Sequence, residues 1–189
     1  YAIQFSSLQQ KESETLRKTL KIPGEHNVSN ALAALTVARV LRVPDKTSFK
    51  ALSRYKGSWR RFEIFQIKKP VPYTLVSDYG HHPTEVRVTV EAARSKWPFQ
   101  AAPFKGLRAH QGLERQGKPK EIWLVFQPHQ YQRTYYLWRD FVKVLSRLPV
   151  QRLIIVDIYD VAGREDKTIQ NAVSSQKLVE AIQNSKFKI

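Results

Sequence analysis

Three short segments of the sequence gather the side chains that could do chemistry. They are residues 78–85 (DYGHHPTE), 127–134 (QPHQYQRT) and 157–159 (DIY). Carboxylates and neutral imidazoles can accept protons, and guanidinium groups bind carboxylate or phosphate oxygens through paired hydrogen bonds. One such segment could arise by chance, whereas three together indicate a ligand-binding or catalytic site.

Each segment directly follows an apolar run that predicts a buried strand: 73–76 (YTLV), 122–126 (IWLVF) and 153–156 (LIIV). In open α/β sheets, ligands bind outside the carboxyl ends of the strands. If the three strands are parallel, their polar residues share one edge of the sheet, which we call the rim. The economical arrangement is strand–helix–strand–helix–strand with right-handed parallel crossovers.

Helices are predicted after each of these strands. The first begins at Pro83, has Glu85 at the positive end of its dipole, and places apolar residues at helical spacing: Val86, Val90 and Ala93. A second helix is predicted over about 135–148, with Leu137, Phe141, Val144, Leu145 and Leu148 as its core stripe. A final helix contains Leu178, Val179 and Ile182.

The first third of the chain predicts an alanine-rich helix after a turn at Pro23-Gly24, ended by Pro44. From periodicity alone, we interpret one of three residues near its beginning as the helix cap: Asn27, Ser29 or Asn30. A short second helix is predicted from Phe49, Leu52 and Tyr55, and residues 62–67 alternate like a strand. Residues 1–22 are compatible with helical turns or with strands.

Composition bounds what the chain can be. Its 189 residues, 42% of them hydrophobic, suffice for one good core and part of a second domain. The sequence lacks cysteine, which excludes disulfides and thiolate metal sites, and no apolar run is long enough to span a bilayer. Because it contains no methionine, even at its start, we expect a piece of a longer chain.

The net charge of +16 raises the possibility of nucleic-acid binding. The basic residues are scattered, however, and no nucleic-acid-binding motif accompanies them. The densest basic stretch, within 97–120, is also rich in glycine and proline. We predict a solvated loop there, with a nucleic-acid surface as the alternative.

The ordered motifs resemble those of the Mur ligases, ATP-dependent enzymes of peptidoglycan synthesis. Residues 23–31 (PGEHNVSNA) resemble the segment that closes their central ATPase domain, and Gly57 with 60–63 (RRFE) resembles the start of their C-terminal domain. The resemblance covers most of residues 20–166. The segments at 78–85 and 127–134, with 157–159 and Arg164-Glu165, favour the member that adds L-alanine.

The resemblance implies an α/β fold. A Rossmann-like C-terminal domain (56–189), with a mostly parallel sheet flanked by helices and truncated at its end, would follow a helical remnant (1–55) of the central domain. The sequence contains no glycine-rich Gly-Lys-Thr/Ser phosphate loop. That loop, the magnesium ligands and the UDP-binding domain are therefore expected outside this chain, and the chain alone is expected to be inactive.

The function implied is a cytoplasmic ligase that joins L-alanine to the carboxylate of UDP-N-acetylmuramate through an acyl phosphate, using ATP and Mg²⁺. One alternative is the related ligase that recycles a murein tripeptide, although the QPH segment favours the alanine-adding enzyme. The other alternative is a basic α/β module that binds nucleic acid or a protein partner. We expect no membrane contact, and nucleic acid is the less favoured partner.

On the nucleotide side, the resemblance implies four ATP-binding residues. Asn27 would face the adenine edge with Asn30 nearby, Arg61 would reach the phosphates, and Asp78 would accept hydrogen bonds from the ribose hydroxyls. His26 is expected to pack rather than to bind. No metal ligand is expected in this chain.

On the amino-acid side, the resemblance implies that His82 and His129 are catalytic and also contact substrate. Arg133 would pair with the alanine carboxylate, and Tyr79 would line the same pocket. His81 is predicted to turn inward. Some family members carry arginine and serine where this chain has Gln130 and Gln132, so this chain has less positive charge there. The ligase hypothesis requires Asp78, His82, His129 and Arg133 to converge on the rim.

Overall fold

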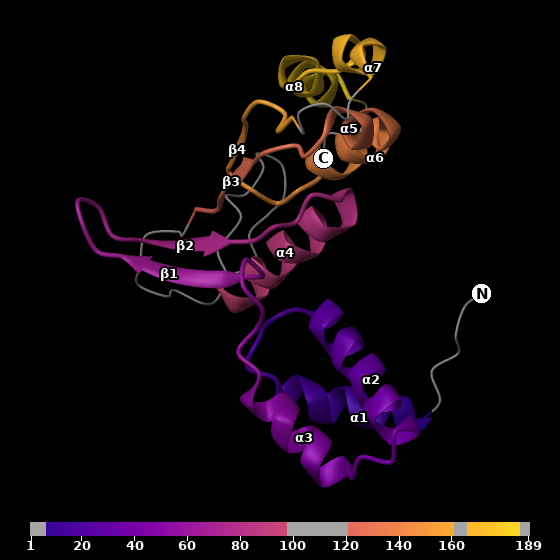
Figure 1. The fold of residues 1–189 in the computed structure, drawn as a ribbon. Helices are drawn as coiled ribbons and strands as arrows, with labels where there is room; N and C mark the ends of the chain where they lie inside the picture. Colours follow the sequence, from indigo (N-terminus) through magenta and orange to yellow (C-terminus); the bar gives the residue numbers. More distant parts are fainter. Residues whose placement is uncertain (1–6, 98–120, 161–165, 186–189) are drawn as a thin grey trace, which may run out of the picture. The chain divides into compact units, whose positions relative to one another are not determined.

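The structure is a computed structural model that describes residues 7–97, 121–160 and 166–185 (Figure 1). The chain divides into two compact units. The first comprises residues 1–79 and 91–96, and the second comprises residues 80–90 and 97–189. The predicted domain boundary at 55/56 stays a prediction. It does not coincide with this division of the chain, which starts the second unit at residue 80.

Three helices open the first unit: α1 (Ser7–Thr19), α2 (Glu25–Val40) and α3 (Asp45–Arg54). They share a core of three buried residues, Leu16, Val28 and Ala31, against which Leu20, Leu32, Phe49 and Leu52 pack. Their amphipathic spacing explains this burial, since residues three and four apart share a helix face. The alanine-rich helix and the short second helix are thus confirmed, and residues 7–19 prove to be helical.

An arginine on α2 links the three helices at their surface. Arg39 lies 2.6 Å from a carboxylate oxygen of Glu12 on α1 and 2.7 Å from one of Asp45 on α3. The hydrogen bond from Arg39 holds the pKa of Asp45 below its usual value. Arg39 and Asp45 are exposed and Glu12 is partly exposed, so each pair adds only modestly to stability.

The interpretation of Asn27, Ser29 or Asn30 as the cap is wrong, because α2 begins earlier than periodicity suggested. Its N-cap is Gly24, with φ 103° and ψ 136°, and all three polar residues lie inside the helix. The Pro23-Gly24 turn starts the helix directly: the backbone N–H of Asn27 donates to the carbonyl of Gly24 at 3.0 Å. The side-chain amide of Asn27 donates back to the Pro23 carbonyl at 2.7 Å.

The first unit continues into a hairpin of β1 (Glu63–Ile67) and β2 (Tyr73–Ser77), which confirms both predicted strands. Glu63 pairs with Ser77 and Ile67 with Tyr73 in antiparallel register. Figure 1 shows the two strands extending side by side. The expectation that 73–76 joins a parallel sheet is wrong for the strands described, because the five-residue connection between β1 and β2 favours antiparallel pairing of neighbours.

The second unit is built on two parallel strands, β3 (Trp123–Phe126) and β4 (Arg152–Ile155). Trp123 pairs with Arg152 and Phe126 with Ile155. The helices α5 (Tyr131–Tyr136) and α6 (Trp138–Leu145) form the crossover between them. This confirms the α/β class and one predicted parallel crossover. The single helix predicted over 135–148 is instead two helices, because the dihedrals of Leu137 (φ −100°, ψ 14°) depart from helical values.

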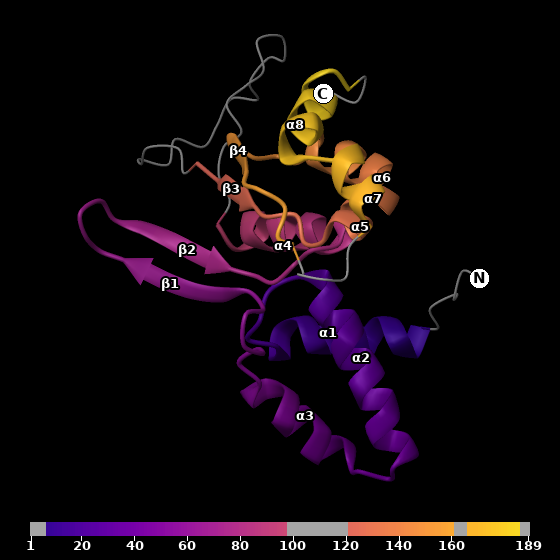
Figure 2. The ribbon, with the colours of Figure 1, turned by 45° about the horizontal axis from the view of Figure 1, so that its top comes forward.

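The core of the second unit joins α4 (Pro83–Lys96), the strands and the later helices. It consists of Val86, Phe126, Phe141, Leu145 and Leu178, and the rings of Phe126 and Phe141 lie 5.4 Å apart. The last two helices are α7 (Lys167–Ala172) and α8 (Ser175–Gln183), which confirms the predicted final helix. Figure 2 shows α5 to α8 gathered beside the β3–β4 pair. None of the described helices has the length and apolar character needed to cross a membrane.

Candidate active site

The rim of the second unit forms where β3 and β4 continue beyond their last paired residues. The backbone N–H of Gln130 donates to the carbonyl of Tyr159 at 2.9 Å, and that of Tyr159 donates to the carbonyl of Pro128 at 2.8 Å. His129 and Tyr159 are therefore partners in a parallel bridge. This pairing brings two of the three polar segments noted in the sequence, 127–134 and 157–159, to the same edge.

His129 is the centre of a cluster at this rim. Its ring stacks on that of Tyr159, with centroids 5.0 Å apart and planes 21° apart, and lies 5.6 Å from the ring of His81. Its Nδ1 lies 3.2 Å from Nη1 of Arg133, in the first turns of α5. His129 and Arg133, two of the residues predicted on the amino-acid side of the site, are therefore in direct contact. The sequence pattern does not indicate the contact of Tyr159, because this contact depends on strand pairing that the pattern does not specify.

The hydrogen bond between Arg133 and His129 determines which ring nitrogen carries the proton. A guanidinium group only donates, so Nδ1 of His129 must accept. A neutral ring that accepts at Nδ1 carries its hydrogen on Nε2, and a protonated ring cannot make this bond. His129 can therefore take up a proton at Nδ1 only after Arg133 releases that nitrogen.

His82 lies at the start of α4, where it acts as a helix cap. Its Nδ1 accepts a hydrogen bond from the backbone N–H of Thr84 at 3.2 Å. In return, Glu85 accepts from the backbone N–H groups of His82 at 3.1 Å and of His81 at 3.0 Å. This differs from a capping box in two ways: an imidazole replaces the hydroxyl, and its bond goes to the second helical residue instead of the third. The predicted catalytic role of His82 stays a prediction, beside this structural one.

His81 is the less exposed of the two adjacent imidazoles, in line with the expectation that it turns inward. Its Nδ1 lies 3.8 Å from a carboxylate oxygen of Glu85. Glu85 therefore joins the helix start to the His81–His129 contact. His81 is partly buried, but it still belongs to the rim because its ring lies next to that of His129.

The predicted nucleotide residues lie in the first unit. Asp78 accepts a hydrogen bond from the backbone N–H of Phe62 at 2.9 Å, and the N–H of Tyr79 donates to the carbonyl of Arg60 at 2.8 Å. The guanidinium of Arg60 lies 4.9 Å from the ring centre of Tyr79 and 5.3 Å from that of Trp59. Asp78 and Tyr79 thus hold the turn at residues 60–62 through its backbone. Arg61 lies in this turn and is exposed.

This turn contains two strained residues beside Arg61. Arg60 has φ 55° and Phe62 has φ 50°, in the left-handed region that costs a residue with a side chain about 1–2 kcal/mol. Such conformations persist only where the surrounding structure holds them. Here the backbone N–H groups of Arg60 and Phe62 donate to the carboxylates of Glu63 and Asp78, and the Arg60 carbonyl accepts from the N–H of Tyr79. The proposed phosphate contact of Arg61 is therefore presented on a backbone of defined shape.

Asn27 and Asn30 lie in the first turns of α2, where Asn27 is partly buried and Asn30 is exposed. An amide nitrogen has two hydrogens, so the bond from Asn27 to the Pro23 carbonyl is compatible with pairing a base edge. Because the nucleotide residues and the His129 cluster belong to different units, the predicted convergence of Asp78 with His129 and Arg133 stays a prediction.

Two sets of predicted residues lie outside the described ranges: most of the basic loop at 97–120, and the pair Arg164 and Glu165. Among the residues that the structure describes, no three His, Cys, Asp or Glu side chains are grouped as a metal ion requires.

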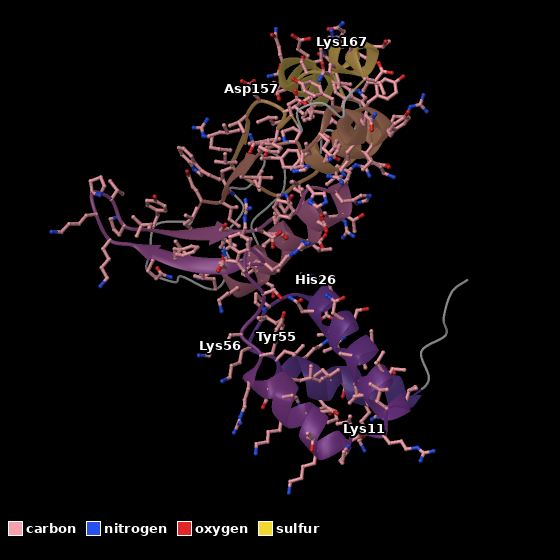
Figure 3. All side chains as sticks on the ribbon, viewed as in Figure 1. Lys11, His26, Tyr55, Lys56, Asp157 and Lys167 are labelled. Carbon is pink, nitrogen blue, oxygen red and sulfur yellow. The ribbon has the colours of Figure 1, made fainter. Side chains whose placement is uncertain are left out.

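His26, labelled in Figure 3 at the first turn of α2, packs against Gly24. Partial burial lowers the pKa of His26 below 6.5, and the negative charges of Asp78 and Glu91 only partly oppose this. The unfolded state therefore binds more protons than the folded state just below pH 6.5.

We expect the first unit to lose stability as the pH falls below about 6.5 toward the lowered pKa of His26, because unfolding then releases an imidazole that takes up a proton. Urea unfolding between pH 5 and pH 7.5 measures this slope. A His26→Gln variant should flatten it, and a His82→Gln variant should not. An unchanged slope in His26→Gln would assign the effect to another group. The lowered pKa values of Glu25 and Asp45 act only below pH 4.5.

Three relatives of this chain carry the same name. The chain is 40% identical over 173 residues to the UDP-N-acetylmuramate–L-alanine ligase of Nitrosomonas eutropha, covering 90% of this chain and 31% of the relative. It is 36% identical over 185 residues to that of Methylococcus capsulatus, covering 94% and 34%. The ligase of Clostridium acetobutylicum is 38% identical over 169 residues, covering 89% and 31%.

No protein-family profile matches the chain. Among solved structures, the UDP-N-acetylmuramate–alanine ligase of Thermotoga maritima matches with 22% identity and a TM-score of 0.42. The match covers 88% of this chain and 40% of the Thermotoga maritima chain. At that TM-score the likeness adds nothing to the topology described above. The chain spans about a third of the length of the curated relatives. The resemblance seen in the motifs is confirmed, because over about nine tenths of its residues this chain is similar to proteins named UDP-N-acetylmuramate–L-alanine ligase.

Proposed function

We propose that this chain is the part of a cytoplasmic ligase that joins L-alanine to UDP-N-acetylmuramate in peptidoglycan synthesis. Two observations support the proposal: the similarity to ligases of that name, and the pairing of His129 with Arg133 at the rim. Since the chain spans about a third of those relatives, we propose that the rest of the enzyme supplies the triphosphate cradle, the magnesium ligands and the UDP site. The 189-residue chain alone would then be inactive.

In this proposal, Arg133 recognises the amino acid through its carboxylate. A guanidinium group offers several donors in a planar fork, so one edge can hold a carboxylate while the charge also attracts it from solution. Arg133 is only partly buried, which leaves it accessible to a small ligand. Nη1 of Arg133 lies 3.2 Å from Nδ1 of His129. A carboxylate bound by Arg133 would therefore place the amine of the same molecule close to His129.

The amine must lose a proton before it can attack a carbonyl carbon, and His129 is the proposed acceptor. In the structure its Nδ1 is occupied by Arg133. A carboxylate that takes over the donors of Arg133 would free Nδ1, and it would also offset the positive charge that opposes protonation of the ring. Binding of the substrate carboxylate would thus prepare His129 to accept the proton from the ammonium group.

ATP would supply the phosphoryl group that activates the muramate carboxylate as an acyl phosphate. From this chain, Asn27 and Asn30 would meet the adenine, Asp78 would meet the ribose hydroxyls, and Arg61 would reach the phosphates. The geometry fits this in part: Asn27 keeps amide pairing capacity beside its bond to Pro23, and the turn around Arg61 has a defined shape. Tyr79, stacked with Arg60, belongs to the same turn, and its predicted contact with substrate remains part of the proposal.

The test is a chimaeric enzyme in which this chain replaces the matching 173-residue segment of the Nitrosomonas eutropha ligase. We expect ATP hydrolysis that depends on both L-alanine and UDP-N-acetylmuramate, and none from the 189-residue chain alone. A chimaera made with the corresponding segment of the Methylococcus capsulatus ligase checks the junctions.

The same chimaera separates the alternative functions. Ligation of a tripeptide in preference to L-alanine would identify the recycling ligase. If the control chimaera is active and this one ligates neither substrate, while the isolated chain binds an oligonucleotide, the ligase proposal is wrong and the net charge of +16 serves nucleic acid.

A further inference from the structure

We propose that Tyr159 is a positioning residue, which sets the plane of the His129 ring so that Nδ1 faces Arg133. This inference rests on the proposed function only in taking His129 and Arg133 as the amino-acid site. Tyr159 would not touch the substrate, and it would act through His129.

The backbone around His129 is held from both sides by Tyr159. The carbonyl of Tyr159 accepts a hydrogen bond from the backbone N–H of Gln130 at 2.9 Å. The backbone N–H of Tyr159 donates to the carbonyl of Pro128 at 2.8 Å. Gln130 has φ 71°, a left-handed conformation that is unusual for a residue with a side chain. Neighbouring contacts must hold such a conformation, and the bond to Tyr159 is one of them. The Cα position of His129 is therefore defined by this strand pairing.

The two ring contacts of His129 have different effects. Stacking on Tyr159, with planes 21° apart, restricts the plane in which the imidazole lies. It does not choose between the two orientations related by a half-turn of the ring. The bond from Arg133 makes that choice, since only one orientation directs Nδ1 toward Nη1. Both contacts are needed because a ring lone pair lies in the ring plane, and a tilted ring directs it away from the donor.

The side chain of Tyr159 contributes little to the core of the unit. It is 51% exposed, whereas its neighbour Ile158 is 8% exposed and is one of the buried core residues. Replacing Ile158 should therefore reduce stability, and replacing Tyr159 should mainly release the ring of His129. The phenyl ring of phenylalanine would stack equally well, so the hydroxyl of Tyr159 is not required for this role.

The test is nitrogen NMR of the His129 ring in the 189-residue chain at neutral pH, without substrate. We expect the wild type to hold its hydrogen on Nε2, with Nδ1 unprotonated. In Tyr159→Ala, the ratio of the Nε2–H form to the Nδ1–H form should fall roughly fivefold, as for the loss of one hydrogen bond at Nδ1. Tyr159→Phe should match the wild type.

Two further variants keep the outcome decisive. Ile158→Val should lower stability and leave the tautomer ratio unchanged, which separates positioning from folding. If Tyr159→Ala does not fold, Tyr159→Leu retains bulk without a flat ring and should show the same shift. A wild-type ratio in the folded alanine or leucine variant would overturn the proposal. Because no substrate is present, failure of the chimaera to ligate alanine would bear on the proposed function alone.

Discussion

Replacing Arg133 with alanine in the chimaeric ligase is expected to lower kcat/KM for L-alanine by roughly a hundredfold or more. The substitution removes charge-assisted hydrogen bonds to the substrate carboxylate, each worth about 1.5–3 kcal/mol. It also leaves Nδ1 of His129 without its donor. Steady-state kinetics at varied alanine concentration measure the loss, and most of it should appear in KM if Arg133 mainly binds the ground state.

Two arginine variants serve as controls for this result. Arg133→Lys keeps the charge without the planar fork, so it should recover only part of the loss. Arg139 on α6 is exposed and lies outside the His129 cluster, and Arg139→Ala should stay within about twofold of the wild type. If Arg133→Ala behaves like Arg139→Ala, the carboxylate assignment is wrong.

The substitution Gly24→Ala is expected to destabilise the first unit by about 3 kcal/mol or more, from backbone strain and overpacking together. Gly24 has φ 103° and ψ 136°, a conformation that side chains rarely permit. A Cβ there would also lie 2.5 Å from Cε1 and 2.7 Å from Nδ1 of His26. Amide hydrogen exchange in α2 measures the effect without requiring both units to unfold together.

Gly57 provides a matched control for the Gly24 prediction. It has a similar φ of 101°, but a Cβ there would meet its nearest atoms only at 3.4 and 3.6 Å. Gly57→Ala therefore carries backbone strain without the clash, and it should cost less than Gly24→Ala. Removing the ring in Gly24→Ala/His26→Ala should relieve the clash and not the strain. If Gly24→Ala and Gly57→Ala lower the stability of the first unit equally, the contact with His26 does not contribute to the effect.

Local patterns in the sequence determined the elements that carry the candidate site. Each of the apolar runs at 73–76, 122–126 and 153–156 forms a strand, and each is followed by the polar segment read from the sequence. His129 lies just before Gln130, the N-cap of α5, and Arg133 lies in that helix, so the sequence placed the two residues four positions apart. Their contact also depends on the conformation of Gln130. The long motifs were specific enough to indicate the Mur ligases, and the curated relatives agree.

The contacts that the sequence did not predict depend on residues far apart in the chain. The stacking of Tyr159 on His129 needs the parallel pairing of β3 with β4, and the antiparallel partner of β2 was decided by its short connection to β1. Similarly, Gly24 moved the start of α2 ahead of the expected caps, because its unusual backbone conformation lets the helix begin at the turn. Periodicity reports which face of an element is apolar. Only tertiary structure decides which neighbour covers that face and which ring nitrogen of His129 faces a donor.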